Sequence, residues 1–201
     1  MSPTSPRLIL ASTSRYRSEL LTRLGLDFKV EGPGVDEAPA AGEPPAALAA
    51  RLALAKASAV ARRYAAAHVI GSDQVAELDG HALGKPLSEA KAVEQLSAAS
   101  GRTVVFHTAV ALVRPDGGHE THTDLTRVRF RRLARAEIER YVALDAPLDC
   151  AGSFRSEGLG VALFEAVETE DPSALVGLPL IWLAAALRRA GLDALAPAQR
   201  A

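Results

Sequence analysis

Two long strand-like segments on either side of a tight turn constrain the fold of this chain more than any other feature. Residues 103–113 and 121–130 flank Pro115-Asp116-Gly117-Gly118, and this run of turn-forming residues predicts a β-hairpin. In the second segment Thr126, Val128 and Phe130 alternate with arginines, so one face of that strand should be buried and the other solvated. The fold must therefore hold a long antiparallel pair of strands.

Shorter apolar runs and helical patterns alternate along the rest of the chain. Residues 31–45 are rich in glycine, proline and acid and are expected to form a long loop of the kind that is often functional. The other patterns predict strands at residues 7–11, 28–30, 68–72, 75–78 and 161–164, and helices at residues 17–24, 45–66, 88–100, 136–144 and 178–190. This order predicts an α/β fold with a mixed central sheet that carries helices on its faces.

Composition and charge exclude several classes of protein. With 201 residues and 48% hydrophobic content, we expect one domain over residues 1–201, with its core at about residues 8–192. A net charge of −1 gives no basic field for nucleic acids or membranes. No unbroken apolar run reaches the length of about 18 residues that suggests a membrane span, and the apolar stretch at residues 8–11 is too short for a secretory signal. The single cysteine, Cys150, fits a reducing compartment, so we expect a cytoplasmic protein.

Lysine is scarce in this chain, which draws attention to the lysines that remain. Of the 23 basic residues only four are lysine: Lys29, Lys56, Lys85 and Lys91. Lys85 lies in the turn Gly84-Lys85-Pro86, twelve residues after Asp73, which interrupts an apolar run and follows the strand expected at residues 68–72. A compact ammonium and a carboxylate brought together there suggest a polyphosphate site that uses a divalent metal. A compositional accident with a solvated turn lysine explains this observation equally well when it is taken alone.

The first junction between a strand and a helix predicts an anion site. Ser12, Thr13 and Ser14 precede the helix expected from Arg17, and free backbone N–H groups at a helix N-terminus favour anions. Arg15 and Arg17 add positive charge at the same point. An ordinary serine cap with solvated arginines accounts for the same residues in isolation. The acidic loop, the carboxylate and the lysines together make the site the stronger interpretation.

Three other patterns are set aside. The segment from Gly80 to Pro86 is one residue too short for a phosphate-binding P-loop and has proline where that motif has serine or threonine. His119 and His122 have a metal-like spacing, but residues three apart in a strand point to opposite faces. Cys150 lies near no base in the sequence and is expected to be a small buried apolar residue.

Six motifs, in order, resemble those of the Maf family of nucleoside triphosphate pyrophosphatases, once described as septum-formation inhibitors. The resemblance runs from about Leu8 to Leu192, and its motifs are Leu10–Leu21, Val35–Glu37, Ala55–Ala57, Gly71–Val75, Gly84–Pro86 and Cys150–Gly160. It implies an elongated α/β fold similar to inosine triphosphate pyrophosphatases, with two lobes around a cleft. It also implies cleavage between the α and β phosphates, and a homodimer.

Within the family, the chain is most similar to the branch that acts on 7-methyl-GTP. The branch acting on dTTP and UTP has threonine in place of Gln74, glutamine in place of Glu157 and arginine in place of Tyr16. An aromatic ring such as Tyr16 can stack on a cationic methylated guanine. Glu157 can accept hydrogen bonds from the guanine N1–H and 2-amino groups. The resemblance therefore implies that Tyr16, Gln74 and Glu157 select the base.

The chain also departs from the family pattern. Proline is usual where this chain has Arg15, a second basic residue is common at Ser18, and lysine is common at Arg155. Arg15 adds an N–H donor and a charge to the helix N-terminus. We expect Arg15 to alter phosphate affinity without removing the site, whereas Ser18 argues against a phosphate contact from two adjacent basic residues.

The resemblance assigns roles to the remaining site residues. Asp73 is expected to act as the general base or to anchor the metal, and Glu37, otherwise a polar loop residue, would help to hold that metal if it folded against Asp73. The cofactor is expected to be Mg²⁺ or Mn²⁺. The triphosphate and its leaving group would be bound by Ser12, Ser14, Arg17, Lys56 and Lys85. Two alternatives stay open: a dTTP or UTP pyrophosphatase, and a nucleotide-binding regulator of cell division without turnover.

Overall fold

The computed structural model describes residues 7–196 and confirms the mixed α/β fold. A seven-stranded sheet has the order β2-β1-β3-β5-β6-β7, with β4 paired to β3. Its strands are β1 (Leu8–Ala11), β2 (Lys29–Glu31), β3 (His68–Leu78), β4 (His81–Leu83), β5 (Thr103–Val113), β6 (His119–Phe130) and β7 (Phe164–Glu168). The helices are α1 (Arg15–Thr22), α2 (Pro45–Ala61), α3 (Glu89–Ala99), α4 (Arg135–Asp145) and α5 (Leu180–Arg189), with short 3-10 turns η1 (Ala151–Ser153), η2 (Leu159–Leu163) and η3 (Ala174–Val176).

The predicted hairpin forms the centre of this sheet. β5 and β6 pair antiparallel from Thr103 opposite Arg129 to Val113 opposite His119. Thr126, Val128 and Phe130 are buried and the arginines between them are exposed, as the alternation predicts. β1 runs parallel to β2 and to β3, whereas the remaining strand pairs are antiparallel.

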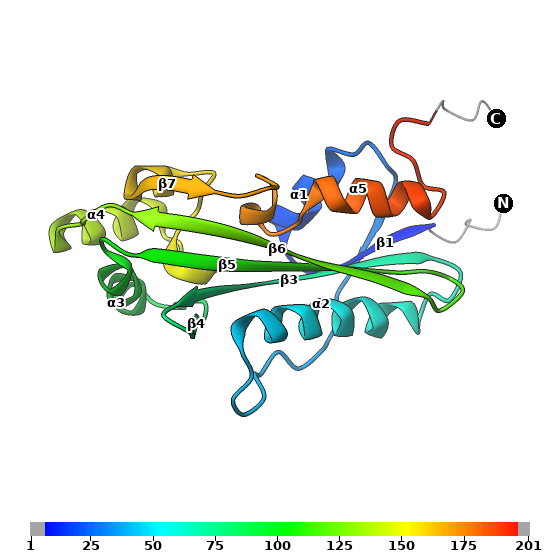
Figure 1. The fold of residues 1–201 in the computed structure, drawn as a ribbon, viewed down its shortest axis with the longest axis horizontal. Coiled ribbons are helices and arrows are strands. Elements are labelled where there is room, and N and C mark those ends of the chain that lie inside the picture. The colour runs from blue at the N-terminus through cyan, green and yellow to red at the C-terminus, as the bar shows by residue number, and fades with distance from the viewer. Residues whose placement is uncertain (1–6, 197–201) are drawn as a thin grey trace.

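Helices divide the molecule into two lobes along these strands. In Figure 1, α2 covers one face of the sheet and α1 and α5 cover the other, while α3 and α4 lie at the opposite end. One apolar cluster packs under α2 and a second under α1 and α5, and a third joins α3, α4 and the aromatic residues near η1. β3, β5 and β6 run through both lobes, so the site between the lobes rests on continuous strands.

Small residues bring α2 very close to β3. Gly71 of β3 lies against Ala53 and Ala57 of α2, and a Cβ atom at Gly71 would collide with the carbonyl oxygen of Ala53 and lie 2.6 Å from the amide nitrogen of Ala57. Because interiors are close-packed, a larger residue here would push the helix away. This approach puts Lys56, one residue before Ala57, within reach of β3.

Several strand boundaries differ from the sequence predictions. β3 continues from His68 to Leu78 instead of breaking after residue 72, because its internal polar side chains have partners on both faces of the sheet. The strand predicted at residues 161–164 is wrong for its first part: η2 occupies Leu159–Leu163, Val161 is 60% exposed, and β7 begins at Phe164.

The helix boundaries shift by at most five residues. α1 begins at Arg15, two residues before the predicted start, because Ser14 supplies its N-cap. α2 ends at Ala61 instead of residue 66, and α5 begins at Leu180, directly after Pro179, instead of at residue 178.

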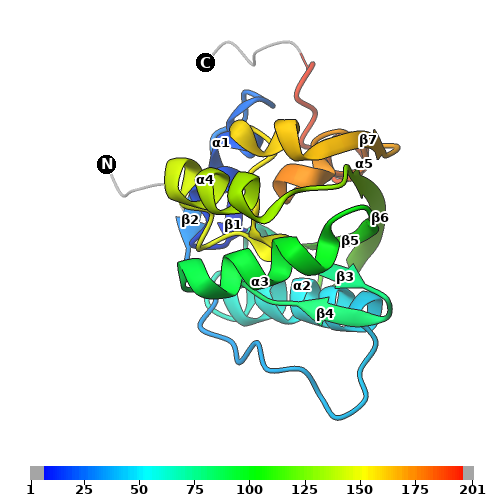
Figure 2. The same cartoon turned by 90° about the vertical axis from the view of Figure 1, so that its left-hand side faces the viewer.

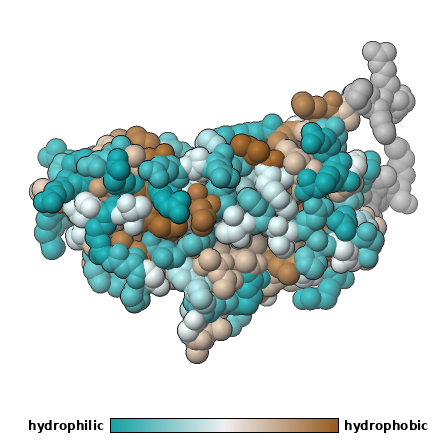
Figure 3. Space-filling view, viewed as in Figure 1, coloured by the Kyte–Doolittle hydropathy of each residue, from teal (hydrophilic) through white to brown (hydrophobic). Residues whose placement is uncertain are grey.

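The long loop between β2 and α2 is confirmed. Seen end-on in Figure 2, it swings out beyond α2 before the chain enters that helix. The face shown in Figure 3 is mostly hydrophilic, with hydrophobic residues in small separate patches. Within residues 7–196 no helix combines the length and the apolar character needed to cross a bilayer.

Candidate functional site

A cavity of about 770 Å³ lies where the two lobes meet. One wall comes from the start of α1 and from α2, and the opposite wall comes from the turn after β4 and from the segment around η1. Its lining includes every residue predicted for the site: Ser12, Ser14, Tyr16, Arg17, Glu37, Lys56, Asp73, Gln74, Lys85 and Glu157.

An interruption in the sheet opens this cavity. β1 pairs with β3 only as far as Gly71, and β4 pairs with β3 only from Ala76 onward. Between these points, residues 72–75 of β3 have no strand neighbour on that edge within the described part of the chain. Consecutive strand residues point to opposite faces, so Asp73 faces α2 and Gln74 faces η3. Asp73 therefore lies inside β3. The sequence had suggested a position after the strand, and that prediction is wrong.

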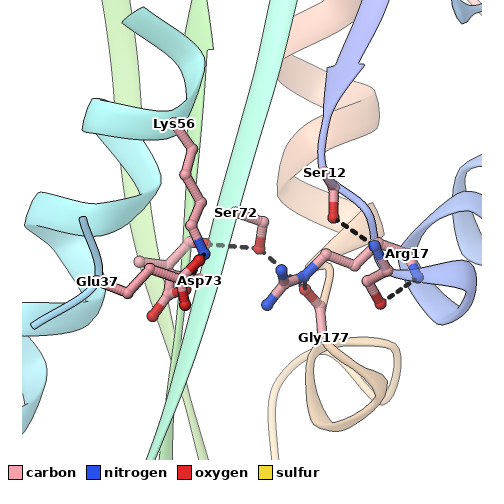
Figure 4. A network of polar contacts seen from close by, with 9 residues as sticks. Ser12, Arg17, Glu37, Lys56, Ser72, Asp73 and Gly177 are labelled. Carbon is pink, nitrogen blue, oxygen red and sulfur yellow. Dashed lines mark hydrogen bonds and ion pairs between the residues drawn. The ribbon is translucent and has the colours of Figure 1, made fainter. Parts of the chain in front are cut away.

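On the α2 face, Lys56 binds two carboxylates at once. Its Nζ lies 2.6 Å from Oδ1 of Asp73 and 2.7 Å from Oε1 of Glu37, as Figure 4 shows. Lys56 and Asp73 are buried, and Glu37 is about half exposed. Partial burial opposes ionisation of Glu37, but the hydrogen bond and charge of Lys56, with Lys85 and Arg17 farther off, lower its pKa below the usual value. The loop residue Glu37 does fold against Asp73.

The pair Glu37 and Asp73 fits a hard divalent cation. Both carboxylates point at one positively charged atom, the Lys56 ammonium, so their oxygens already converge on a cationic position. No cluster of three or more His, Cys, Asp or Glu side chains suited to a metal occurs among residues 7–196. Mg²⁺ usually binds to one or two carboxylates together with phosphate oxygens and water, and it is rarely held by protein ligands alone.

The start of α1 has the donors expected of an anion site. Ser14 is the N-cap, and its Oγ accepts from the backbone N–H of Arg17 at 3.4 Å. The N–H of Ser14 donates to Oγ of Ser12 at 3.1 Å. The amides of Arg15 and Tyr16 begin the helix, where no intrahelical acceptor is available. These groups, at the edge of the cavity, favour a negatively charged ligand.

Arg17 is held in place by a residue that the sequence predictions missed. Its Nε donates to the carbonyl oxygen of Gly177 at 2.9 Å, and Oγ of Ser72 lies 2.9 Å from the same oxygen (Figure 4). Burial lowers the pKa of the Arg17 guanidinium, and the nearby carboxylates of Asp73 and Glu37 oppose that shift. The turn-forming run Gly177-Leu178-Pro179 is the sequence signal that could have marked this segment.

Gln74 is anchored on the other face of β3. Its Nε2 lies 3.0 Å from Oγ1 of Thr108 and 3.0 Å from each of the carbonyl oxygens of Ala174 and Leu175. The amide nitrogen is therefore committed to protein acceptors. Only the side-chain carbonyl oxygen of Gln74 is therefore available to contact a substrate.

Tyr16 and Glu157 also line a smaller cavity of about 340 Å³ that adjoins the first. The Arg15 guanidinium lies over the Tyr16 ring, 4.7 Å from its centroid, and donates to its hydroxyl at 2.8 Å. Glu157 is exposed and accepts from Oγ of Ser156 at 2.7 Å. Glu19 and Asp145 line the smaller cavity as well, together with Arg23 and Arg155, and Arg155 pairs with Asp145 at 2.9 Å. The groups left to receive a positively charged ring are the Tyr16 face and the exposed Glu157.

The lysines divide into two groups. Lys56 and Lys85 line the large cavity, and Lys85 is exposed there with no ion-pair partner among residues 7–196. Lys29 and Lys91 pair with Glu31 and Glu94 on the surface. Two of the four lysines in this lysine-poor chain therefore line the cavity.

The patterns set aside earlier remain outside the chemistry. His119 is exposed, and the ring of His122 stacks on Trp182 with centroids 5.5 Å apart. Cys150 lines the large cavity and is only partly buried, less than expected. Burial, followed by the charge of Asp149, raises the pKa of its thiol to about 12, so the thiolate needed for nucleophilic chemistry is scarce at neutral pH.

Comparisons with known proteins show the family to which the chain belongs. A family model described as Maf-like protein matches residues 7–190. The chain is 62% identical over 187 residues to a 7-methyl-GTP pyrophosphatase from Xanthomonas oryzae pv. oryzae, covering 92% of this chain and 97% of that protein. It is 52% identical over 195 residues to a 7-methyl-GTP pyrophosphatase from Albidiferax ferrireducens, with coverages of 96% and 98%.

Two solved structures were also matched. One is a nucleoside-triphosphatase / dITP/XTP pyrophosphatase from Mycobacterium abscessus, with a TM-score of 0.45, 19% identity and coverages of 96% of this chain and 99% of that chain. The other is the Staphylococcus aureus Ham1 protein, with a TM-score of 0.46, 19% identity and coverages of 76% and 88%.

Proposed function

This chain belongs to the Maf-like protein family, and on that premise we propose that it hydrolyses 7-methyl-GTP to 7-methyl-GMP and pyrophosphate. The observation that carries the proposal is the convergence of Glu37 and Asp73 on Lys56 at the floor of the interlobe cavity. This arrangement places acidic and basic groups where a triphosphate and a hard cation can meet. A binding protein without turnover has no need of the buried carboxylate.

The triphosphate would lie between the start of α1 and the two cavity lysines. Ser12, Ser14 and Arg17 present donors at the start of α1, Lys56 presents its ammonium from α2, and Lys85 presents one from the opposite wall. Donors fixed before the reaction stabilise the charge that develops on a departing pyrophosphate. Arg17 is especially suited, because its bond to Gly177 fixes the guanidinium before substrate arrives.

We propose Mg²⁺ or Mn²⁺ as the cofactor, held by Glu37 and Asp73. The cation would neutralise phosphate charge and lower the pKa of a water molecule for attack on the α-phosphorus. Lys56 would be released toward the phosphates when the two carboxylates take the cation. Asp73, in the middle of a rigid strand, would orient the attacking water or accept its proton as the bond between the α- and β-phosphates breaks.

We propose that the base occupies the end of the cleft that the two cavities share. Tyr16 and Glu157 line both cavities, and Glu157 is exposed with no ion-pair partner among residues 7–196. A methylated guanine carries a positive charge, which an aromatic face and carboxylates attract. The names of the curated relatives support the same substrate.

The direct test is pyrophosphate release from a panel of 7-methyl-GTP, GTP, UTP and dTTP, with Mg²⁺, with Mn²⁺ and with a chelator. We expect 7-methyl-GTP to be the preferred substrate and the chelator to abolish release. Preference for UTP or dTTP would move the chain to the other branch of the family, and no release from any nucleotide would contradict the proposal. We further propose that the chain acts as a single-domain cytoplasmic homodimer, for which sedimentation of the purified protein gives the oligomeric state.

A further inference from the structure

The segment from Asp171 to Leu178 supplies backbone carbonyls to the floor of the site. The Gly177 carbonyl accepts from Arg17, and Oγ of Ser72 lies within hydrogen-bonding distance of it. The carbonyls of Ala174 and Leu175 accept from Gln74. A phosphate-binding arginine and a predicted base-selecting glutamine are thus oriented by the same short segment, although they come from different elements.

A single buried carboxylate fixes both ends of that segment. Asp171 is 5% exposed. Its Oδ1 accepts from the backbone N–H of Ser173 at 2.9 Å and from the Ser173 hydroxyl, and its Oδ2 accepts from the N–H of Ile181 at 2.7 Å. Its own carbonyl accepts from the N–H of Ala174 at 2.9 Å. These bonds close the turn at 174–177 and connect it to the first turn of α5.

Ser173 adds a second connection inside this closure. Its Oγ accepts from the N–H of Leu180 at 2.8 Å and lies 3.0 Å from the carbonyl oxygen of Leu178. Asp171 lines neither cavity. Any influence of Asp171 on the substrate must therefore pass through the carbonyls of the turn.

We propose that Asp171 is a positioning residue of the active site, which holds the 174–177 turn so that its carbonyls orient Arg17 and Gln74. The inference rests on the proposed function for its kinetic consequence. A carboxylate can accept from several donors at once, whereas an asparagine side chain keeps one acceptor oxygen and brings an NH₂ group against the remaining N–H donors. Asp171→Asn therefore loosens the turn while keeping the size of the side chain.

The first measurement reports the geometry without any turnover. The hydrogen-bonded Nε–H of Arg17 should give a protected signal in ¹H–¹⁵N spectra, assigned by its loss in Arg17→Lys. In Asp171→Asn we expect solvent exchange of this Nε–H to rise by about 10-fold or more, as for local opening of a closed contact. Unchanged exchange would overturn the proposal.

The second measurement reports catalysis. We expect Asp171→Asn to lower kcat/KM by about 10- to 100-fold, as small misplacements of positioning groups do. In an Arg17→Ala background the same change should lower kcat/KM by clearly less, because only Gln74 is then left for the turn to orient and coupled sites are not additive. An equal loss in both backgrounds would show a general structural role and overturn the proposal.

Asp124→Asn is the matched control. Asp124 is as buried as Asp171 and lies close to it; burial, followed by the charge of Asp171, raises the pKa of its carboxyl. Within residues 7–196 its side chain has one bond, accepted from the Thr169 hydroxyl at 3.4 Å, and that hydroxyl also lies 3.0 Å from the carbonyl oxygen of Asp171. No bond in this part of the chain joins the Asp124 side chain to the 174–177 turn. We expect it to leave the Arg17 signal and kcat/KM unchanged, and a loss as large as that of Asp171→Asn would contradict specificity for Asp171.

If Asp171→Asn fails to fold, Ser173→Ala takes its place, because it removes only the bonds of the Ser173 hydroxyl. The same two measurements are then expected to show the same changes. If the wild-type protein hydrolyses no nucleotide, the proposed function fails, while the Nε–H exchange still decides the positioning role.

Discussion

The ammonium of Lys56 and the carboxylate of Asp73 meet at 2.6 Å with both side chains buried. Breaking a buried pair by removing one charge costs more stability than the pair contributes as a whole, because the remaining charge is left without a partner. Here Glu37 is a second acceptor for the same ammonium. Substitutions at Asp73 can therefore separate chemistry from folding.

Asp73→Asn should fold but lose turnover. The change preserves size, and Glu37 still pairs with Lys56, whereas the second metal-binding carboxylate is gone. We expect kcat to fall by about 100-fold or more, in the range of positioned acid–base groups. Initial rates of pyrophosphate release and a thermal melt must be measured on one preparation. Near-normal rates would remove Asp73 from the mechanism.

Lys85→Arg should be poorly tolerated although it keeps the charge. Lys85 stands in the cavity without an ion-pair partner among residues 7–196, and a planar guanidinium cannot reproduce the contact of a compact ammonium. Lys91→Arg is the control, since Lys91 pairs with Glu94 on the exposed side of α3. Steady-state kinetics should show a clear loss in the first variant and almost none in the second; equal activities would mean that the scarcity of lysine has no functional meaning.

Glu157→Gln should weaken the preference for the methylated base. The free carboxylate is exposed, and a bound guanine would cover it. Because a charge-assisted bond is worth about 1.5–3 kcal/mol, the kcat/KM ratio of 7-methyl-GTP to GTP should fall by about 10- to 100-fold. Competition between the two nucleotides measures this ratio directly. Equal slowing of 7-methyl-GTP and GTP hydrolysis would instead assign Glu157 to the chemistry that the two substrates share.

Gly71→Ala should destabilise the protein by pushing α2 off β3. The new methyl group would collide with the carbonyl of Ala53, and overpacking of this kind costs about 1–3 kcal/mol. Urea unfolding gives the loss in free energy. Gly32→Ala is the control, because its Cβ would meet only Thr13 at an ordinary 3.6 Å. A variant as stable as the wild type would show that the helix can shift freely.

Glu37 should make stability depend on acid pH. Its pKa is lower in the folded protein than the usual value of 4.5, so the unfolded chain binds more protons between the two values. The contribution is complete above pH 4.5 and is lost as the pH falls through the folded pKa. Denaturant unfolding of wild type and Glu37→Gln across this range should show a smaller acid-dependent loss in the variant. Parallel curves of unfolding free energy against pH for the two proteins would exclude Glu37 as a source of the pH dependence.

Local sequence patterns predicted most of the elements, but they missed β4 and the interruption that makes the site. The β5–β6 hairpin follows from alternation and turn residues, and Ser14 caps α1 because its hydroxyl satisfies a free amide. The continuity of β3 through Asp73 could not be predicted from its own residues, since the partners of its polar side chains are far away in sequence. The pattern favoured a break where tertiary contacts allow a strand.

The motifs identified the cavity-lining residues, but the contacts that orient them were missed. Gly177 acts through its carbonyl oxygen, and a backbone group leaves little mark on a sequence. Asp171 carries no distinctive spacing relative to the residues that it supports. Residue chemistry shows which groups can react, whereas the fold shows what holds them still.

The long strands that cross both lobes also limit how the molecule can move. β3, β5 and β6 are hydrogen-bonded to one another along almost their whole length, so a hinge between the lobes would have to break ladder bonds. Domain closure usually depends on a few loop residues that absorb the rotation, and no such joint separates these lobes along the central strands. The cavity is therefore set by the continuous sheet, and the loop between β2 and α2 contributes to it through Glu37, which reaches Lys56. A nucleotide would enter a site whose two lobes keep a fixed separation.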